Sequence, residues 1–220
     1  MRRSLVALAV MTVTALAVAV PAGAATGQVT RFRTSGTRAE AFWFTKTKTS
    51  YTGTTAIVVK TKQGAELIAS VFQGKLVNGQ FVGGTDTSLR GPGGTNFVTT
   101  GFSFAINEPK LTSASVRGSG LPARQCTVDA DGNPTSCRHI TINVNVTWAG
   151  HGSLTRSVSN SRTKTAGFSM HSHFAGTTRA ATATATGTIA GHTLTAKQLE
   201  FADLGIAKSG EITRCIGNAC

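Results

Sequence analysis

His171 and His173 are the residues whose types and spacing most directly suggest chemistry. In an extended strand alternate side chains share a face, so both imidazole rings would lie side by side. Zinc takes imidazole nitrogens as ligands, and His139 or His151 on a neighbouring strand could complete the site of a metal-dependent hydrolase. Because no acidic residue lies near the pair in sequence to orient the rings, an ordinary solvated strand face explains the pattern better. The sequence therefore predicts no metal or other cofactor and keeps the hydrolase as an alternative.

Other catalytic patterns are weak or missing. The sequence has no Gly-x-Ser-x-Gly elbow and no His-Glu-x-x-His helix. Asp129, Asp131 and Asn133 match the first three ligand positions of a calcium loop. The match ends there, because Pro134 stands where that loop needs glycine and Ile140 where it needs glutamate. A turn at the tip of a hairpin explains these residues, and the sequence favours a protein that is not an enzyme.

Aromatic and amide side chains indicate binding. Sugars are commonly held by an aromatic face flanked by amide and hydroxyl groups. Trp43 and Tyr51 lie in one threonine-rich stretch, and Asn143 and Asn145 alternate along another. We expect these residues to provide a ligand-binding surface, although Trp43 would suit a core equally well.

The charge balance adds a second class of ligand. The chain has 22 Lys and Arg residues against nine Asp and Glu, a formal net charge of +13. Such a surface attracts polyanions, including acidic cell-wall polymers and anionic lipid. The basic residues are spread along the chain rather than grouped in a block, which argues against a specific nucleic-acid site. We therefore expect a monomer whose partner is an anionic or carbohydrate polymer at the cell surface.

Residues 1–24 read as an export signal. Arg2-Arg3 precede an apolar run over residues 5–20, and Ala22-Gly23-Ala24 has the small-x-small form that signal peptidase cleaves. The run is short for a membrane anchor, which takes about 20 apolar residues. We expect a secreted, extracellular protein without a transmembrane segment, like many Thr- and Gly-rich β proteins of bacteria. Residues 25–220 would form a single β domain.

The four cysteines all follow the predicted signal, at Cys126, Cys137, Cys215 and Cys220. Disulfides are the default in an oxidising compartment. Three pairings are possible, and we favour Cys126 with Cys137 and Cys215 with Cys220 because short loops close readily. A zinc site is the weaker interpretation, since neither spacing is the short knuckle that such sites use twice.

Residues 139–148 form the clearest secondary-structure element of the chain. Apolar and polar side chains alternate there without interruption, as in a half-buried antiparallel strand. The side predicted to be buried consists of Ile140, Ile142, Val144, Val146 and Trp148.

Weaker alternation elsewhere predicts further strands. Residues 39–51 read as one long strand with a bend near Thr45, where the buried side changes. Turns are expected at Lys62-Gln63-Gly64 and at Asn78-Gly79, the second being a strong hairpin signal.

The sequence as a whole predicts an antiparallel β-sandwich, with a barrel-like form as a variant, held by two local disulfides. The function we expect is extracellular binding or cell-surface association without catalysis. A pore-forming protein is a second alternative, because residues 181–188 alternate Ala and Thr like an amphipathic hairpin. Alanine is too small to give that hairpin much membrane affinity.

Overall fold

The computed structural model describes residues 28–165, 168–179 and 183–216, so the predicted export signal lies outside the described residues. Apart from one short 3-10 turn, η1 (Pro92–Gly94), every regular element in these residues is a β-strand. The all-β prediction is therefore confirmed. Within the described residues, no helix has the length and apolar character needed to cross a membrane.

Twelve strands are present in the described part of the chain. In chain order they are β1 (Gln28–Lys46), β2 (Ser50–Thr61), β3 (Gly64–Val77), β4 (Gln80–Leu89), β5 (Phe102–Ile106), β6 (Ser113–Val128), β7 (Pro134–Gly150), β8 (Thr155–Thr165), β9 (Phe168–Thr178), β10 (Ala183–Ile189), β11 (His192–Leu194) and β12 (Leu199–Ile216).

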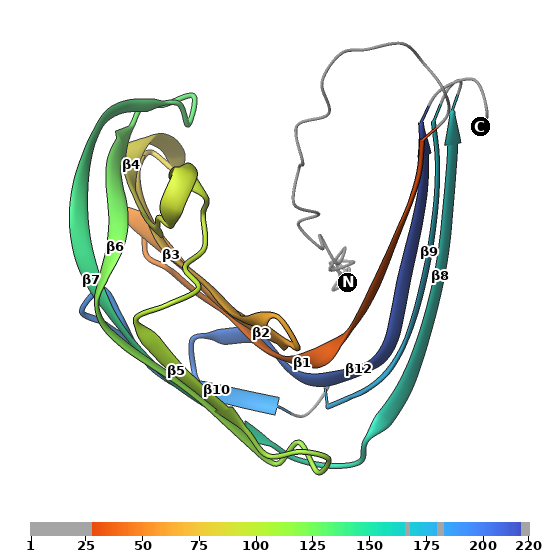
Figure 1. Cartoon of the computed structure of the whole chain (residues 1–220). Helices are drawn as coiled ribbons and strands as arrows, with labels where there is room; N and C mark the ends of the chain where they lie inside the picture. Colours follow the sequence, from red (N-terminus) through yellow and green to blue (C-terminus); the bar gives the residue numbers. More distant parts are fainter. Residues whose placement is uncertain (1–27, 166–167, 180–182, 217–220) are drawn as a thin grey trace, which may run out of the picture.

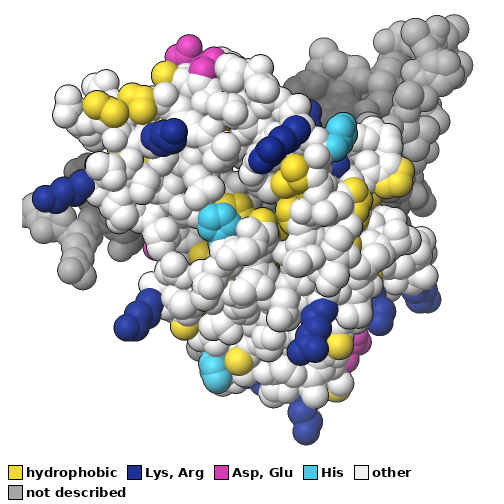
Figure 2. Space-filling view, turned by 90° about the vertical axis from the view of Figure 1, so that its left-hand side faces the viewer, with side chains coloured by type: hydrophobic (Ala, Val, Ile, Leu, Met, Phe, Trp, Pro, Cys, Tyr) yellow, Lys and Arg dark blue, Asp and Glu magenta, His cyan; other side chains and the backbone are white. Residues whose placement is uncertain are grey.

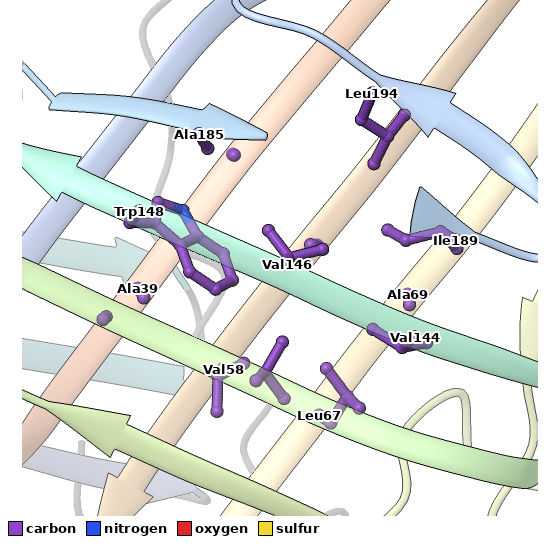
Figure 3. Close-up of a cluster of buried hydrophobic side chains, with 14 of the residues drawn as sticks. Ala39, Val58, Leu67, Ala69, Val144, Val146, Trp148, Ala185, Ile189 and Leu194 are labelled. Carbon is purple, nitrogen blue, oxygen red and sulfur yellow. The ribbon is translucent and has the colours of Figure 1, made fainter. Parts of the chain in front are cut away.

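All twelve strands belong to one antiparallel sheet, in the order β11-β10-β7-β6-β4-β3-β2-β1-β12-β9-β8, with β5 paired to β6. The predicted sandwich of two separate sheets is not confirmed. Instead, the single sheet folds over, so that β6, β7 and β10 cross above β1, β2 and β3 (Figure 3). Long-range pairing of β1 with β12, near the two ends of the described chain, is what makes the sheet continuous.

The core lies between these two layers of the folded sheet. It consists mainly of Ala, Val and Leu side chains with two tryptophans. The Trp43 indole nitrogen donates to the carbonyl oxygen of Ala185 in β10 at 3.2 Å. The Trp148 nitrogen donates to the carbonyl oxygen of Glu40 in β1 at 3.0 Å. Each tryptophan therefore fills the space between the layers and also bonds to the backbone of the opposite one.

Strand β7 confirms the alternation predicted for residues 139–148. Ile142, Val144, Val146 and Trp148 are buried, and the intervening residues from Thr141 to Thr147 are exposed. The register places Val144 opposite Ile189 of β10. The outer face of this layer, viewed in Figure 2, is largely neutral and polar, with isolated Lys and Arg side chains.

The prediction of one continuous strand over residues 39–51 is wrong. β1 ends at Lys46 and β2 begins at Ser50. Between them the Thr47 hydroxyl accepts hydrogen bonds from the backbone nitrogens of Thr49 at 3.2 Å and Ser50 at 3.0 Å, which closes a tight turn. The hairpins predicted at residues 62–64 and at Asn78-Gly79 are both confirmed.

The Cys126–Cys137 disulfide is confirmed and joins directly opposed residues of β6 and β7. The half-cystines are 11 residues apart, and for a loop of that size chain-entropy models give roughly 3 kcal/mol. Cys220 and the Cys215 side chain lie outside the described residues, so the second predicted disulfide remains a prediction.

Gly36 marks the point where β1 and β12 leave the two-layer body. β1 pairs with β2 only from Gly36 onward, but pairs with β12 back to Gln28. With β9 and β8 added beyond β12, four strands form an arm that rises opposite β4 and gives the sheet a concave side (Figure 1). A Cβ atom at Gly36 would overlap the Lys60 carbonyl oxygen, so the close crossing of backbones requires glycine.

Candidate functional site

Five aromatic rings form a continuous cluster across β1, β2, β3 and β4. Ring centroids are 6.4 Å apart for Phe42 and Phe44, 6.0 Å for Phe44 and Tyr51, and 5.6 Å for Tyr51 and Phe72. Phe81 lies 6.0 Å from both Tyr51 and Phe72. We call these five residues the aromatic platform.

Strand alternation explains why the platform lies outside the core. Ala41 and Trp43 are buried between the layers, so Phe42 and Phe44 point the other way. Because Trp43 reaches β10, the platform faces the opposite, concave side of the sheet (Figure 1). Cross-strand register then aligns Phe44 with Gly53, and Gly53 with Phe72.

A glycine beneath one ring, Gly74, lets Tyr51 lie flat on the sheet. A Cβ atom at Gly74 would overlap the ring of Tyr51, which pairs with it across β2 and β3. At Gly53 a Cβ atom would stand 3.5 Å from Cε2 of Phe42. Tyr51 therefore lies across the backbone of β3 rather than standing up from β2. The Tyr51 ring therefore directs a face to the concave side.

The platform is incompletely covered. Phe42 is 38% exposed, and Phe201, its pairing partner in β12, is 36% exposed. The other four rings of the platform are half-buried. Contiguous apolar surface of this kind costs stability in water and commonly marks a site of interaction.

One end of the platform is basic. Lys46 pairs with Tyr51, Lys75 pairs with Ser50, and Lys48 lies in the turn between β1 and β2. All three side chains are exposed. We call them the lysine rim.

Asp86 lies beside the platform, opposite Phe72 in the pairing of β3 and β4. Burial raises the pKa of its carboxyl group, and the charges of Arg124 and Arg90 act in the opposite direction. The lysine rim thus lies at one end of the aromatic platform, and the Asp86 carboxyl group lies beside it in β4. Burial disfavours the ionised form of that carboxyl group.

The structure separates the four ligand-binding residues predicted from sequence. Tyr51 belongs to the platform, whereas Trp43 is buried in the core on the other face of the sheet. Asn143 and Asn145 are exposed on the outer face of β7, and the Asn143 side-chain oxygen accepts a bond from the Gly120 nitrogen at 2.9 Å.

The four phenylalanines of the platform are not among the binding residues predicted from sequence. The spacing of Phe42 and Phe44, which would share one face of a strand with Lys46 and Lys48, was the sequence feature that could have indicated this surface.

The predicted histidine pair lies on β9 in the arm. His171 is exposed, and the His173 Nδ1 atom is hydrogen-bonded to the Asn160 side-chain oxygen of β8 at 2.6 Å. His139 is exposed on β7, a strand that does not pair with β9, and His151 follows the end of β7. In the described residues no three His, Cys, Asp or Glu side chains are grouped so as to hold a metal ion.

No family model matches this chain, and no curated protein or solved structure shows significant similarity to it.

Proposed function

We propose that this protein is a secreted, non-catalytic binding protein whose aromatic platform and lysine rim hold an acidic carbohydrate polymer. The carrying observation is a cluster of five neighbouring, partly exposed aromatic rings on the concave face of the sheet. Exposed lysines surround the turn at one end of this cluster. The folded sheet would serve as a sandwich-like support, acting outside the cell as a monomer.

An aromatic ring that lies on the sheet, as Tyr51 does over Gly74, is suited to binding carbohydrate. A pyranose ring has an apolar face of C–H groups, which stacks on an aromatic face while its hydroxyl groups remain in water. Rings at 5.6–6.4 Å from one another extend across four strands, so successive units of a polymer would each find a surface. A small apolar ligand would instead favour an enclosed cavity.

The lysine rim favours an acidic polymer. Lys46, Lys48 and Lys75 are exposed around one turn, and this arrangement attracts carboxylate or sulfate groups in a salt-dependent way. Single-stranded nucleic acid would also stack on aromatic rings next to cations. We favour the carbohydrate because the Lys and Arg residues are spread along the chain and not grouped in a block.

Binding can be measured by calorimetry with three polymers: a uronic-acid polysaccharide, a neutral glucan and single-stranded DNA. We expect the uronic-acid polymer to bind and its affinity to fall as salt rises. Phe42→Ala should weaken binding about tenfold, because we expect a stacked sugar to contribute at the lower end of the roughly 1–3 kcal/mol that a base stacked on one ring contributes. Val59→Ala is a matched control, because Val59 is 37% exposed against 38% for Phe42.

The lysine rim has its own control near the far end of strand β2. Lys46→Gln with Lys48→Gln removes two charges beside the platform, and Lys60→Gln with Lys62→Gln removes two exposed charges around the opposite end of β2. Only the first pair should reduce affinity and flatten its salt dependence. Equal loss in both pairs, stronger binding of DNA, or no binding of any polymer would contradict the proposal.

A further inference from the structure

A polar pocket lies on the opposite side of β3 and β4 from the aromatic platform. It has a volume of about 250 Å³ and opens beside β7, at the turn between β10 and β11. Phe72 of the platform and Gln73 of the pocket are consecutive residues, so the pleat of β3 directs them to opposite faces. Nothing proposed for the platform uses this pocket.

The inner face of the sheet changes character at this pocket. Along β3, β4 and β6 the inward positions Val71, Leu89 and Ala123 are apolar and buried. Two residues away on the same strands the inward positions become polar, and they line the pocket as Gln73, Thr87 and Gln125. Three adjacent strands thus exchange core residues for amide and hydroxyl groups at one place.

Hydrogen bonds hold these groups in position. Gln125 Nε2 donates to the Thr87 hydroxyl at 3.2 Å. Arg138 donates from Nε and Nη2 to Gln125 Oε1 at 3.1 and 2.7 Å. The amide of Gln125 is therefore fixed at both ends, and its orientation does not depend on a ligand.

The opposite wall is a tight turn fastened to β7. Ala190 has φ 50° and Gly191 has φ 81°, a left-handed conformation that is uncommon for a residue other than glycine. The Ala190 nitrogen donates to the Asn143 carbonyl oxygen at 3.0 Å. This turn sets His192 on the pocket wall, which Asn143 also lines. Non-glycine residues held in sparsely populated conformations concentrate at binding sites.

We propose that this pocket binds a small, neutral, hydroxyl-rich compound of monosaccharide size. Four of its lining residues carry hydrogen-bonding side chains on the inner face: Gln73, Thr87, Gln125 and His192. Among the described residues that line it, none is Asp, Glu, Lys or Arg, and the nearby Arg138 is engaged with Gln125 Oε1; we therefore expect a neutral ligand. Ile140 and Ile142 supply an apolar wall for the C–H face of a sugar ring.

The volume supports a single ring rather than a chain. Pockets for drug-sized ligands measure roughly 300–1,000 Å³, and this one is smaller. His192 also lines a second pocket of about 90 Å³ that reaches Trp43. The predicted ligand-binding residues Trp43 and Asn143 therefore lie on either side of His192.

The test is a titration of ¹⁵N-labelled protein with D-glucose, D-galactose and N-acetylglucosamine, with D-glucuronate as an anion of similar size. We expect at least one neutral sugar to shift the side-chain amide signals of Gln73 and Gln125 and the His192 ring signals. Gln73→Leu, an exposed position, should lower that affinity about tenfold through the loss of a hydrogen bond. Gln80→Leu, an exposed glutamine at the start of β4, should leave it unchanged.

Three results would overturn the inference: no shift with any neutral sugar at tens of millimolar, equal binding of glucuronate, or binding that survives Gln73→Leu combined with His192→Phe. The platform variant Phe42→Ala should leave the titration unaltered. Failure of the pocket would therefore be distinguishable from failure of the polymer-binding proposal.

Discussion

Replacement of Trp148 by phenylalanine tests whether the two layers are held together as described. Trp148 has no exposed surface, and its indole nitrogen bonds to Glu40 in the other layer at 3.0 Å. The change Trp148→Phe keeps a large aromatic ring in the core. It removes the five-membered part of the indole and the hydrogen bond between the layers.

The expected loss follows from those two terms. A buried tryptophan removes about 150–250 Å² from water, and losing roughly a quarter of it at about 25 cal/mol per Å² costs about 1–1.5 kcal/mol. The hydrogen bond contributes about 1 kcal/mol more. We expect the free energy of unfolding to fall by about 2–3 kcal/mol, a large part of the roughly 5–15 kcal/mol typical of a domain.

Urea unfolding followed by circular dichroism measures this loss, and the remaining Trp43 gives a fluorescence probe in the same core. Thr147→Ala is the control, because Thr147 is the exposed neighbour on the same strand and surface changes usually stay within about 0.5 kcal/mol. A loss for Trp148→Phe no larger than that of the control would refute the two-layer packing.

Two further changes probe the platform and a charge cluster in β1. Gly74→Ala should push the Tyr51 ring off β3, since a Cβ atom would overlap it. Polymer affinity should therefore fall, and the free energy of unfolding should drop by about 1–3 kcal/mol. Gly53→Ala should change both quantities little in the same assays. Burial raises the pKa of Glu40 above 4.5, against the opposing charge of Arg38, so the native state binds more protons than the unfolded state above pH 4.5. Stability contributed by Glu40 is then lost as pH rises from 4.5 through the raised pKa, and Glu40→Gln should gain stability relative to wild type over that interval in urea unfolding at stepped pH. A constant difference across the series would show that Glu40 is not the titrating group.

The sequence was sufficient for elements whose pattern is local. The alternation in residues 139–148 was predicted correctly because one side of β7 is buried from Ile142 to Trp148. Asn78-Gly79 was recognisable because both residues adopt positive φ. The turn at Thr47 was missed because it contains no Gly, Pro, Asn or Asp. In one continuous strand Trp43 and Tyr51 would share a face because they lie an even number of positions apart, whereas the turn puts them on opposite faces.

What could not be predicted depends on pairing between distant strands. The platform needs Tyr51 to lie over Gly74, 23 positions away, and the pocket needs His192 to reach β7 and β3. Contacts between strands so far apart in sequence cannot be predicted from a local pattern of alternating apolar and polar residues. The same is true of the single sheet, whose continuity rests on β1 meeting β12.

Because Gly36 has no side chain, the backbones of β1 and β2 can approach closely where the arm leaves the two-layer body. The arm therefore starts within a single strand, at the residue where β1 stops pairing with β2 and continues with β12. A larger residue there would have to displace the Lys60 carbonyl oxygen. If the concave side holds a polymer as proposed, the room available to it depends on a position that no ligand needs to touch.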